Sequence, residues 1–250
     1  MRIRLENIDC SLLLRELSAG SIDLMLQDPP YGVTQNQWDK EPPLSILWVE
    51  WERVIKNNGA IIFFSQQPFT SKLVLSRPEL FRYDLIWYKP LASGFLNAGH
   101  MPLRNHEHVL LFYKKPPIYN PQMGVGIRKK GNRKHNRIGT NYGKFASQGT
   151  TSYFDDKGKR FPQSVIEITN GDRTKENNHP TQKPLDLMRY LIRTFSNEGD
   201  VVFDGYFGSG TTAEACVIEK RSFIGSEINL DYYQNAVKRV EESKKIYRLF

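Results

Sequence analysis

The segment Asp28-Pro29-Pro30-Tyr31 combines an acid, a stiffened backbone and an aromatic ring at the end of an apolar run. Each proline restricts its own φ, and Pro30 biases Pro29 towards an extended conformation. A carboxylate on such a backbone is a hydrogen-bond acceptor that is held still, beside a ring that can stack on a planar group. As an isolated tetrapeptide, the same residues are also typical of a surface turn. The segment therefore predicts either a catalytic site or a plain turn.

A second candidate site is the stretch VVFDGYFGSGTTAEA, residues 201–215. An apolar strand delivers Asp204, three glycines allow a tight turn with close approach of a ligand to the backbone, and a helix follows from about Thr211. This pattern predicts a nucleotide-binding turn, with a purely structural turn as the alternative. The lysine of a phosphate-binding P-loop is absent.

The same stretch formally satisfies the dinucleotide fingerprint G-x-G-x-x-G/A through Gly208, Gly210 and Ala213. Glu227 ends the next predicted strand, where a ribose-binding acid is expected. A nicotinamide oxidoreductase is therefore one hypothesis. Against it, a carboxylate at Asp204 suits a ligand that carries an ammonium or sulfonium charge, whereas it would repel a pyrophosphate.

Lysines and arginines concentrate between Lys114 and Arg160, where twelve of them stand against two acids. Aromatic residues are interleaved with these cations, namely Tyr119, Tyr142, Phe145, Tyr153 and Phe154. Cations neutralise phosphates and rings stack on splayed bases, so the stretch predicts contacts with a nucleic acid. The net charge of +8 and the isoelectric point near 9.4 also favour a polyanionic partner. A solvated loop is the alternative.

Composition excludes several classes of protein. The two cysteines, Cys10 and Cys216, form no CxxC pair, which excludes a disulfide framework and a thiolate metal site, and we expect both to be reduced. No long apolar run and no apolar N-terminal segment is present, so we expect a soluble, cytoplasmic protein that does not enter membranes. His100, His106 and His108 surround a predicted strand without further ligands, so we expect no metal.

Alternating strands and helices must position these motifs within one core that carries one insertion. We predict strands at 1–7, 21–27, 60–64, 83–89, 108–114, 164–168, 200–204 and 222–227, and helices at 11–17, 44–55, 185–195, from about 211, and over 233–240. Asn57-Asn58-Gly59 is expected to end the second helix. The pattern predicts an α/β fold with a Rossmann-like, mainly parallel sheet, helices on both faces and ligands at the carboxyl ends of the strands.

Together these motifs resemble the S-adenosylmethionine-dependent DNA amino-methyltransferases of the β class, in which the catalytic motif comes first and the cofactor motif last. The resemblance covers nearly the whole chain and is carried by DPPY (28–31), NNGAIIFF (57–64), NHEHVLLFYK (105–114), HPTQKP (179–184), FDGYFGSGTT (203–212) and FIGSEINLDYY (223–233). It implies a circularly permuted methyltransferase fold. The catalytic half would span 1–113, an inserted target-recognition region 114–162, and the cofactor-binding half 163–250.

The resemblance assigns chemistry to the first segment. Asp28 and the carbonyl of Pro29, stiffened by Pro30, would accept hydrogen bonds from the exocyclic amino group of a base, and Tyr31 would stack on that base after it leaves the double helix. An acid at position 28 favours adenine N6, because family members that act on cytosine N4 more often carry serine there.

The resemblance also implies a site for S-adenosylmethionine. Asp204 would lie near the methionine ammonium and Glu227 on the ribose hydroxyls. The other residues implied in cofactor binding are Phe207, Gly208, Ser209, Gly210, Thr211, Lys183, Asp9 and Cys10. An exposed lysine at a helix start is the alternative for Lys183, and capping or core packing is the alternative for Asp9 and Cys10.

One departure from the family pattern concerns the residue after Asp204. The family usually has Asp-Pro-Phe before its glycines, whereas here Gly205 and Tyr206 follow the acid. The stiffening by proline is lost, which bears on cofactor affinity.

We therefore expect a site-specific methyltransferase that makes N6-methyladenine in double-stranded DNA. A cytosine-N4 enzyme, a catalytically impaired DNA-binding relative and the oxidoreductase are the alternatives. The residues expected to contact DNA are Arg128, Lys129, Lys130, Arg133, Lys134 and Arg137. The resemblance also admits a homodimer and a cognate restriction endonuclease as partners.

Overall fold

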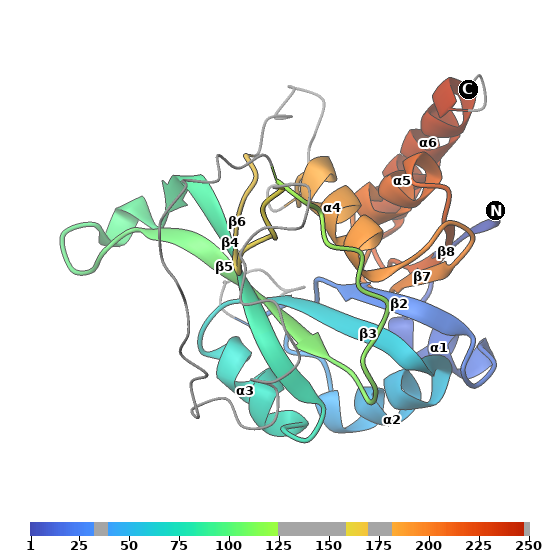
Figure 1. Cartoon of the computed structure of the whole chain (residues 1–250), viewed down its shortest axis with the longest axis horizontal. Helices are drawn as coiled ribbons and strands as arrows, with labels where there is room; N and C mark the ends of the chain where they lie inside the picture. Colours follow the sequence, from blue (N-terminus) through green and yellow to red (C-terminus); the bar gives the residue numbers. More distant parts are fainter. Residues whose placement is uncertain (33–39, 125–158, 170–181, 248–250) are drawn as a thin grey trace, which may run out of the picture. The chain divides into compact units, whose positions relative to one another are not determined.

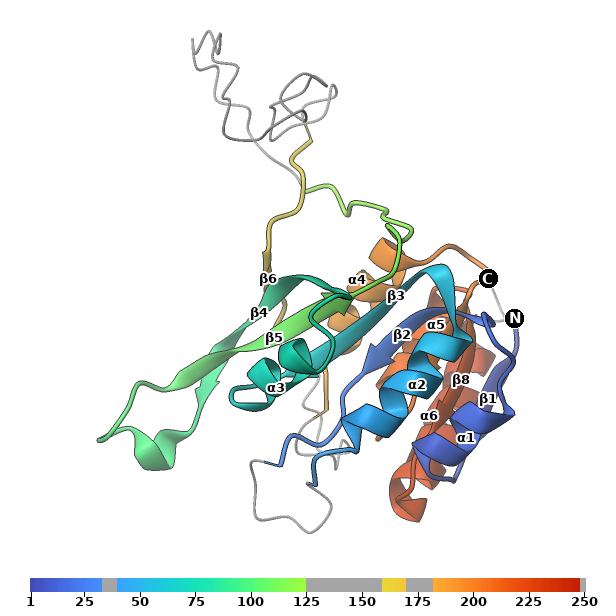
Figure 2. The same cartoon turned by 90° about the horizontal axis from the view of Figure 1, so that it is seen from below.

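A computed structural model describes residues 1–32, 40–124, 159–169 and 182–247. An eight-stranded sheet, in the order β1-β8-β7-β2-β3-β5-β4-β6, runs through these residues (Figures 1 and 2). The strands are β1 (Ile3–Glu6), β2 (Ile22–Gln27), β3 (Ile55–Ser65), β4 (Phe81–Ser93), β5 (Arg104–Phe112), β6 (Val165–Glu167), β7 (Val201–Asp204) and β8 (Ser222–Ser226). Among these strands only β5 is antiparallel to its neighbours, β3 and β4, and the other pairs are parallel.

Helices cover both faces of this sheet. The helices α1 (Cys10–Glu16), α2 (Leu44–Val54) and α3 (Phe69–Ser76) pack on one face, and α4 (Leu185–Phe195), α5 (Thr211–Ile218) and α6 (Leu230–Tyr247) pack on the other. A hydrophobic core lies on each face of the sheet, between the strands and the helices. Strand β2 contributes to both cores, with Leu24 and Leu26 in one and Met25 in the other. A strand buried on both faces needs such a continuous apolar run. The predicted α/β fold is confirmed.

The prediction that Asn57-Asn58-Gly59 ends a helix is wrong. Helix α2 ends at Val54, and β3 begins at Ile55, so these three residues lie inside a strand. A Cβ atom at Gly59 would lie 2.7 Å from the carbonyl oxygen of Asp23 on β2. The glycine therefore permits the close approach of two strands, at a shift in their register.

Two features were not predicted from the sequence. Helix α3 has eight residues and follows Pro68, and the sequence pattern did not distinguish it from a loop. Strands β4 and β5 form a hairpin that is longer than predicted, since β4 continues to Ser93 and β5 begins at Arg104. A short 3-10 helix, η1 (Phe95–Asn97), lies between the two strands.

The chain divides into two compact units. Residues Met1–Asn120 and Ser164–Phe250 form the first, which holds the sheet and all the helices named above, and Pro121–Gln163 form the second. Within the described part of the second unit, the main chains of Gly124 and Arg160 pair in an antiparallel bridge, with N···O distances of 2.9 and 3.0 Å.

Candidate active site

Three acids lie at the carboxyl ends of three adjacent parallel strands. Asp28 follows β2, Asp204 is the last residue of β7, and Glu227 follows β8. Strand β7 pairs with β2 on one side and with β8 on the other. The carboxyl edge of a parallel sheet is the usual ligand-binding edge of this kind of fold. The sequence motifs that predict chemistry are therefore brought to one edge.

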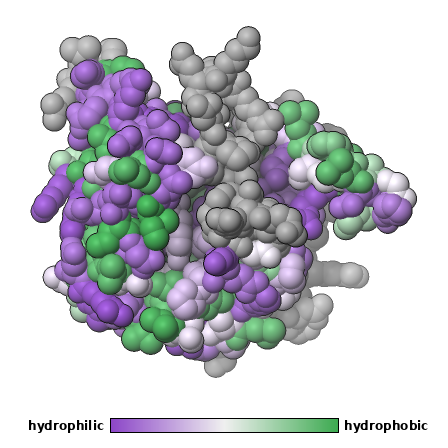
Figure 3. All heavy atoms as spheres, turned by 180° about the vertical axis from the view of Figure 1, so that it is seen from behind, coloured by the Kyte–Doolittle hydropathy of each residue, from purple (hydrophilic) through white to green (hydrophobic). Residues whose placement is uncertain are grey.

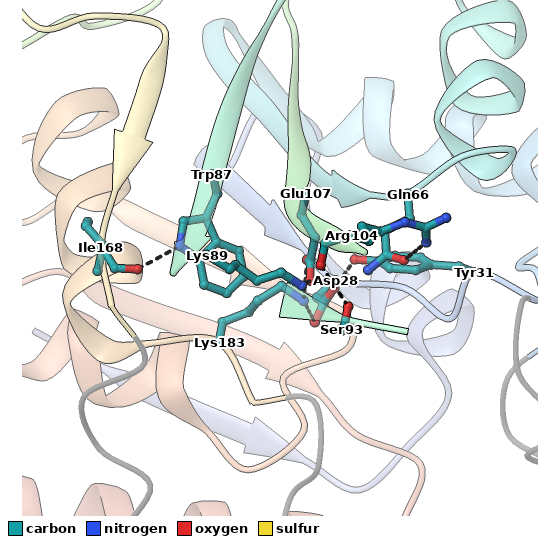
Figure 4. A network of polar contacts seen from close by, with 10 residues as sticks. All are labelled: Asp28, Tyr31, Gln66, Trp87, Lys89, Ser93, Arg104, Glu107, Ile168 and Lys183. Atoms are coloured by element: carbon teal, nitrogen blue, oxygen red, sulfur yellow. Dashed lines mark hydrogen bonds and ion pairs between the residues drawn. The ribbon is translucent and has the colours of Figure 1, made fainter. Parts of the chain in front are cut away.

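The segment from Asp28 to Tyr31 is a fixed unit in the structure (Figure 4). The Tyr31 hydroxyl donates a hydrogen bond of 2.7 Å to Oδ1 of Asp28. The Tyr31 ring stacks on Phe69 of α3, with 5.6 Å between the ring centroids and 25° between the planes. Pro29 is buried, whereas Asp28 is half-buried. The carboxylate is thus held from one side by its own segment while it keeps some access to solvent.

A chain of four alternating charges ends on the same carboxylate (Figure 4). The ammonium of Lys183 donates a hydrogen bond of 2.6 Å to Oδ2 of Asp28 and lies 3.3 Å from Oε2 of Glu107. The other oxygen of Glu107 accepts a hydrogen bond of 2.7 Å from Lys89 on β4. We refer to Lys89, Glu107, Lys183 and Asp28 as the charge chain.

Glu107 and Lys183 are buried, so the charged form of each depends on its oppositely charged neighbours. Burial by itself would raise the pKa of Glu107, but the ammonium groups of Lys183 and Lys89 outweigh it and lower that pKa. Burial by itself would lower the pKa of Lys183, but Asp28 and Glu107 outweigh it and raise that pKa. Glu107 is therefore a carboxylate and Lys183 an ammonium, and neutralising either one would leave a buried charge without its partner.

The charge chain changes the interpretation of Lys183 and adds residues that the sequence did not reveal. The Lys183 side chain is 7% exposed, which overturns the alternative of an exposed lysine at a helix start. Its predicted contact with the cofactor stays a prediction, while its contact in the structure is with Asp28. Glu107 lies in the segment NHEHVLLFYK, which carried part of the resemblance, but nothing in its spacing pointed to Lys183 or Lys89.

Asp204 has a different environment from Asp28. Its Oδ2 accepts a hydrogen bond of 2.6 Å from the Thr212 hydroxyl, and its Oδ1 accepts one of 2.9 Å from the main-chain N–H of Tyr206. Burial raises the pKa of Asp204 to about 7, although these two hydrogen bonds act in the opposite direction. In the described part of the chain Asp204 forms no ion pair. A buried acid of this kind is suited to a cationic ligand.

The glycine turn connects Asp204 to Glu227. The main-chain N–H of Gly208 donates a 3.0 Å hydrogen bond to Oε2 of Glu227, and the N–H of Asn229 donates one of 2.8 Å to Oε1. Gly210 has φ +83°, and a Cβ atom there would lie 2.7 Å from Cβ of Ala236 on α6. Burial raises the pKa of Glu227 despite these bonds. The turn therefore requires glycine at 210 for its conformation and for its packing.

The remaining predicted cofactor residues surround this turn. Ser209 donates a 3.0 Å hydrogen bond to Gln182, Thr211 begins α5, and Phe207 is buried with its ring 6.2 Å from that of Phe223. Asp9 caps α1 by accepting a 2.8 Å hydrogen bond from the N–H of Ser11. The structure therefore bears out the alternative in which Asp9 caps a helix. Contacts of these residues with a cofactor stay predictions.

Gly205, the residue that departs from the family pattern, packs against Cys10 and donates a hydrogen bond to Gln27. A Cβ atom at 205 would lie 2.3 Å from Sγ of Cys10, so the cysteine side chain occupies the space that a larger residue would need. The N–H of Gly205 donates a 3.2 Å hydrogen bond to Oε1 of buried Gln27, which in turn donates to the carbonyl of Phe203 at 3.0 Å. Proline has no N–H to donate. The packing of Cys10 therefore favours glycine here, and the hydrogen bond to Gln27 excludes proline.

Some predictions concern residues outside the described part of the chain. The six residues expected to contact DNA, Arg128, Lys129, Lys130, Arg133, Lys134 and Arg137, all lie there. Their role stays a prediction, as does that of the region 114–162.

None of the helices in the described residues could span a membrane. Within the same residues no group of three or more His, Cys, Asp or Glu side chains could hold a metal ion. His106 and His108 lie on β5 with ring centroids 5.5 Å apart, and Nδ1 of His108 lies 3.0 Å from Oδ2 of Asp84.

A parallel sheet with acids and a glycine turn at its carboxyl edge is typical of Rossmann-like proteins that bind nucleotide-type ligands. The family model described as DNA methylase, for N6 and N4 methyltransferases, matches residues 22–238. This chain belongs to that family and is a DNA methyltransferase. The family is S-adenosylmethionine-dependent. The family predicted from the sequence is confirmed, and the oxidoreductase hypothesis is replaced.

Curated relatives agree with this membership. Type II methyltransferase M.HpaI of Haemophilus parainfluenzae is 30% identical over 245 residues, which cover 91% of this chain and 71% of the relative. DNA adenine methyltransferase YhdJ of Escherichia coli (strain K12) is 27% identical over 243 residues, 91% of this chain and 79% of the relative.

Two solved structures share the fold. The M1.HpyAVI–SAM complex has a TM-score of 0.64 and 23% identity, covering 95% of this chain and 98% of that one. The cytosine-N4-specific PvuII DNA methyltransferase has a TM-score of 0.66 and 15% identity, covering 99% and 92%. At these identities the likeness concerns the fold alone.

Proposed function

We propose that this protein transfers a methyl group from S-adenosylmethionine to N6 of adenine in double-stranded DNA. The observation that carries the proposal is the Asp28 carboxylate, which Tyr31 and Lys183 fix at the sheet edge two strands from Glu227 and one from Asp204. The relative named as a DNA adenine methyltransferase supports adenine. The cytosine-N4-specific structure with the same fold keeps cytosine N4 as the second candidate.

The residues around the glycine turn fit the methyl donor. Asp204, a buried acid with a pKa of about 7 and no ion pair within the described residues, would accept the ammonium of the methionine moiety. Glu227, fixed by two main-chain N–H groups, would accept from the ribose hydroxyls. When bound, S-adenosylmethionine supplies an electrophilic methyl group on a sulfonium.

Asp28 and the carbonyl of Pro29 would act on the nucleophile. The amino nitrogen of a base is a weak nucleophile because its lone pair is delocalised into the ring. Hydrogen bonds from this amino group to two fixed acceptors favour a more tetrahedral nitrogen, whose lone pair can point at the methyl group. The amino proton then leaves to Asp28 or to water.

Lys183 would position the acceptor in this scheme. Because its ammonium is held by Glu107 as well as by Asp28, it cannot follow the Asp28 carboxylate into other orientations without losing its second partner. The charge chain therefore reduces the number of orientations that Asp28 can adopt before the base arrives. Fixing a group in its reactive geometry in advance is a large part of enzymatic rate acceleration.

The basic region 114–162 would read the target sequence, with its cations on phosphates and guanine edges. Its residues from Arg128 to Arg137 are the first candidates for DNA contacts. A homodimer and a cognate restriction endonuclease belong to the proposal as partners, since the relatives include type II methyltransferases.

One experiment tests the proposed reaction. The protein is incubated with methyl-labelled S-adenosylmethionine and duplex DNA, and the DNA is then digested to nucleosides. Label in N6-methyladenine is the expected result, and label in N4-methylcytosine would replace adenine by the second candidate. DNA binding without label in any DNA or RNA would contradict the proposal and indicate an impaired relative.

A further inference from the structure

The tip of the β4–β5 hairpin, residues 90–103, exposes a cluster of large apolar side chains. Leu91, Phe95 and Leu96 are 77%, 75% and 85% exposed, and Met101 and Leu103 are exposed as well. Figure 3 shows apolar side chains on the hairpin, at the right of that view. Single exposed apolar residues are ordinary, but a contiguous exposed group of them marks an interaction site.

The tip is a formed structure and not a frayed loop end. Gly94, with φ +86°, is the N-cap of the 3-10 helix η1, and the N–H of Asn97 donates a 2.9 Å hydrogen bond to the carbonyl of Gly94. The N–H of Met101 donates a 3.0 Å bond to the carbonyl of Asn97. Where the two strands of the hairpin meet the tip, the Ser93 hydroxyl donates a 3.2 Å bond to the carbonyl of Arg104. The apolar side chains are thus presented on a fixed turn.

The same hairpin supplies two members of the charge chain. Lys89 immediately precedes the tip on β4, and Glu107 follows it by four residues on β5. Arg104, at the first position of β5, is hydrogen-bonded to Gln66 at the end of β3. The tip therefore continues directly from the strands beside Asp28, and both views of the fold show it extending away from the helices (Figures 1 and 2).

The charge of the hairpin suits a polyanion. From Tyr88 to Asn105 the sequence contains no acid, and Arg104 adds a positive charge at the base of the tip. A surface that exposes apolar side chains and carries no acid does not repel phosphates. Its two strands also carry Lys89 and Glu107 of the charge chain that ends on Asp28, so DNA held at that site is the partner the tip would meet. Apolar side chains that enter between base steps are a known way in which proteins unstack a duplex.

We propose that the hairpin tip is a wedge that enters the DNA duplex beside the target base pair, with Phe95 and Leu96 occupying space vacated by the departing base. This inference rests on the proposed function, in which the target base leaves the helix to reach Asp28. A paired base must be unstacked and unpaired before transfer, and an inserted apolar group lowers the cost of that state.

The test compares two substrates that differ only in base pairing. The methylation site is first mapped on DNA modified by the wild-type protein. Duplexes with that site are then made with the target base either paired or opposite an abasic position. The variant Phe95→Ser/Leu96→Ser is assayed on both, beside Leu75→Ser, which removes an equally exposed leucine (76%) from α3.

We expect the tip variant to lose about tenfold to a hundredfold in kcat/KM on the paired duplex and to approach wild-type activity on the abasic duplex, where little unpairing cost remains. Leu75→Ser should resemble the wild type on both. Its thermal unfolding midpoint and that of the tip variant should match the wild type, because all these side chains are exposed.

Three results would overturn the wedge. One is unchanged activity of the tip variant on the paired duplex, and another is an equal loss on both substrates. The third is a shift from dimer to monomer in sedimentation of the tip variant without DNA, which would make the tip a contact between two copies. If the wild-type protein methylates neither substrate, the proposed function fails, and this outcome is separate from those three.

Discussion

Asp28 and Asp204 lie at the ends of neighbouring strands, yet Asp28 is paired with a cation whereas Asp204 accepts neutral hydrogen bonds. Asp28 receives a protein cation, Lys183, from a segment 155 residues away in the sequence. Among the described residues, Asp204 receives only neutral hydrogen bonds, from Thr212 and from the main chain of Tyr206, and burial raises its pKa to about 7. An acid that is already paired can serve as a fixed acceptor, whereas an acid without a cation is ready for a cationic ligand. This difference supports the proposal that the base is bound at Asp28 and the cofactor at Asp204.

The largest expected effect is that of Asp28→Asn on chemistry. The amide keeps the size of the carboxylate but loses the charge and one acceptor, so we expect single-turnover methyl transfer to fall by about 10²- to 10⁴-fold. The dissociation constant for S-adenosylmethionine should change by less than about threefold, because the cofactor is assigned to Asp204. A large loss of cofactor affinity with an intact transfer rate would contradict this proposal and indicate that Asp28 binds the cofactor.

The converse variant, Asp204→Asn, should act on binding first. We expect cofactor affinity to fall by about tenfold to a hundredfold, because a charge-assisted bond to the ammonium becomes a neutral one. At saturating cofactor the transfer rate should recover most of its wild-type value. Equilibrium binding and single-turnover rates on the same preparation measure the two effects separately, and a rate loss that saturation does not relieve would contradict the assignment.

A smaller effect is expected from Glu107→Gln, which tests the charge chain without touching Asp28. Without the Glu107 charge, Lys183 keeps one anionic partner and holds Asp28 less firmly, so we expect kcat to fall by about tenfold. The KM for DNA and the affinity for S-adenosylmethionine should stay within about twofold. Glu79→Gln, at an exposed acid near the start of β4, is the matched control. A loss of cofactor affinity in Glu107→Gln would instead place Lys183 on the methionine carboxylate.

The smallest effect concerns stability near Asp204. Gly205→Ala forces a Cβ atom against Cys10, and we expect it to lower the free energy of unfolding by about 1–3 kcal/mol. Cys10→Ala in the same chain should recover most of that loss, and Cys216→Ala, at the other buried cysteine, should recover none. Denaturant unfolding of the single and double variants measures this coupling, and additive losses for the Cys10 pair would disprove it.

Both acids could be predicted from the sequence, but the cation that pairs with Asp28 could not. Both lie where an apolar strand meets a turn, so alternation of strands and helices was enough to place them at one sheet edge. The charge chain depends on contacts that no local pattern contains, because Lys89 and Glu107 meet through antiparallel pairing and Lys183 reaches them from the start of α4. Gly59 and Gly205 show the same limit, since each is required by a backbone or side chain distant in the sequence.

Proton release on cofactor binding tests the difference between the two acids most directly. With its pKa raised to about 7, Asp204 is partly protonated at pH 7, and a bound ammonium favours its charged form. Calorimetry at pH 7 in two buffers of different ionisation enthalpy should therefore show release of a fraction of a proton per S-adenosylmethionine bound, and affinity should rise as the pH increases from 6 to 7. Asp204→Asn should abolish this release, whereas Asp28→Asn should keep it in reduced form, because the Asp28 charge contributes to the raised pKa of Asp204. No proton release in the wild type, or release that persists in Asp204→Asn, would contradict the account.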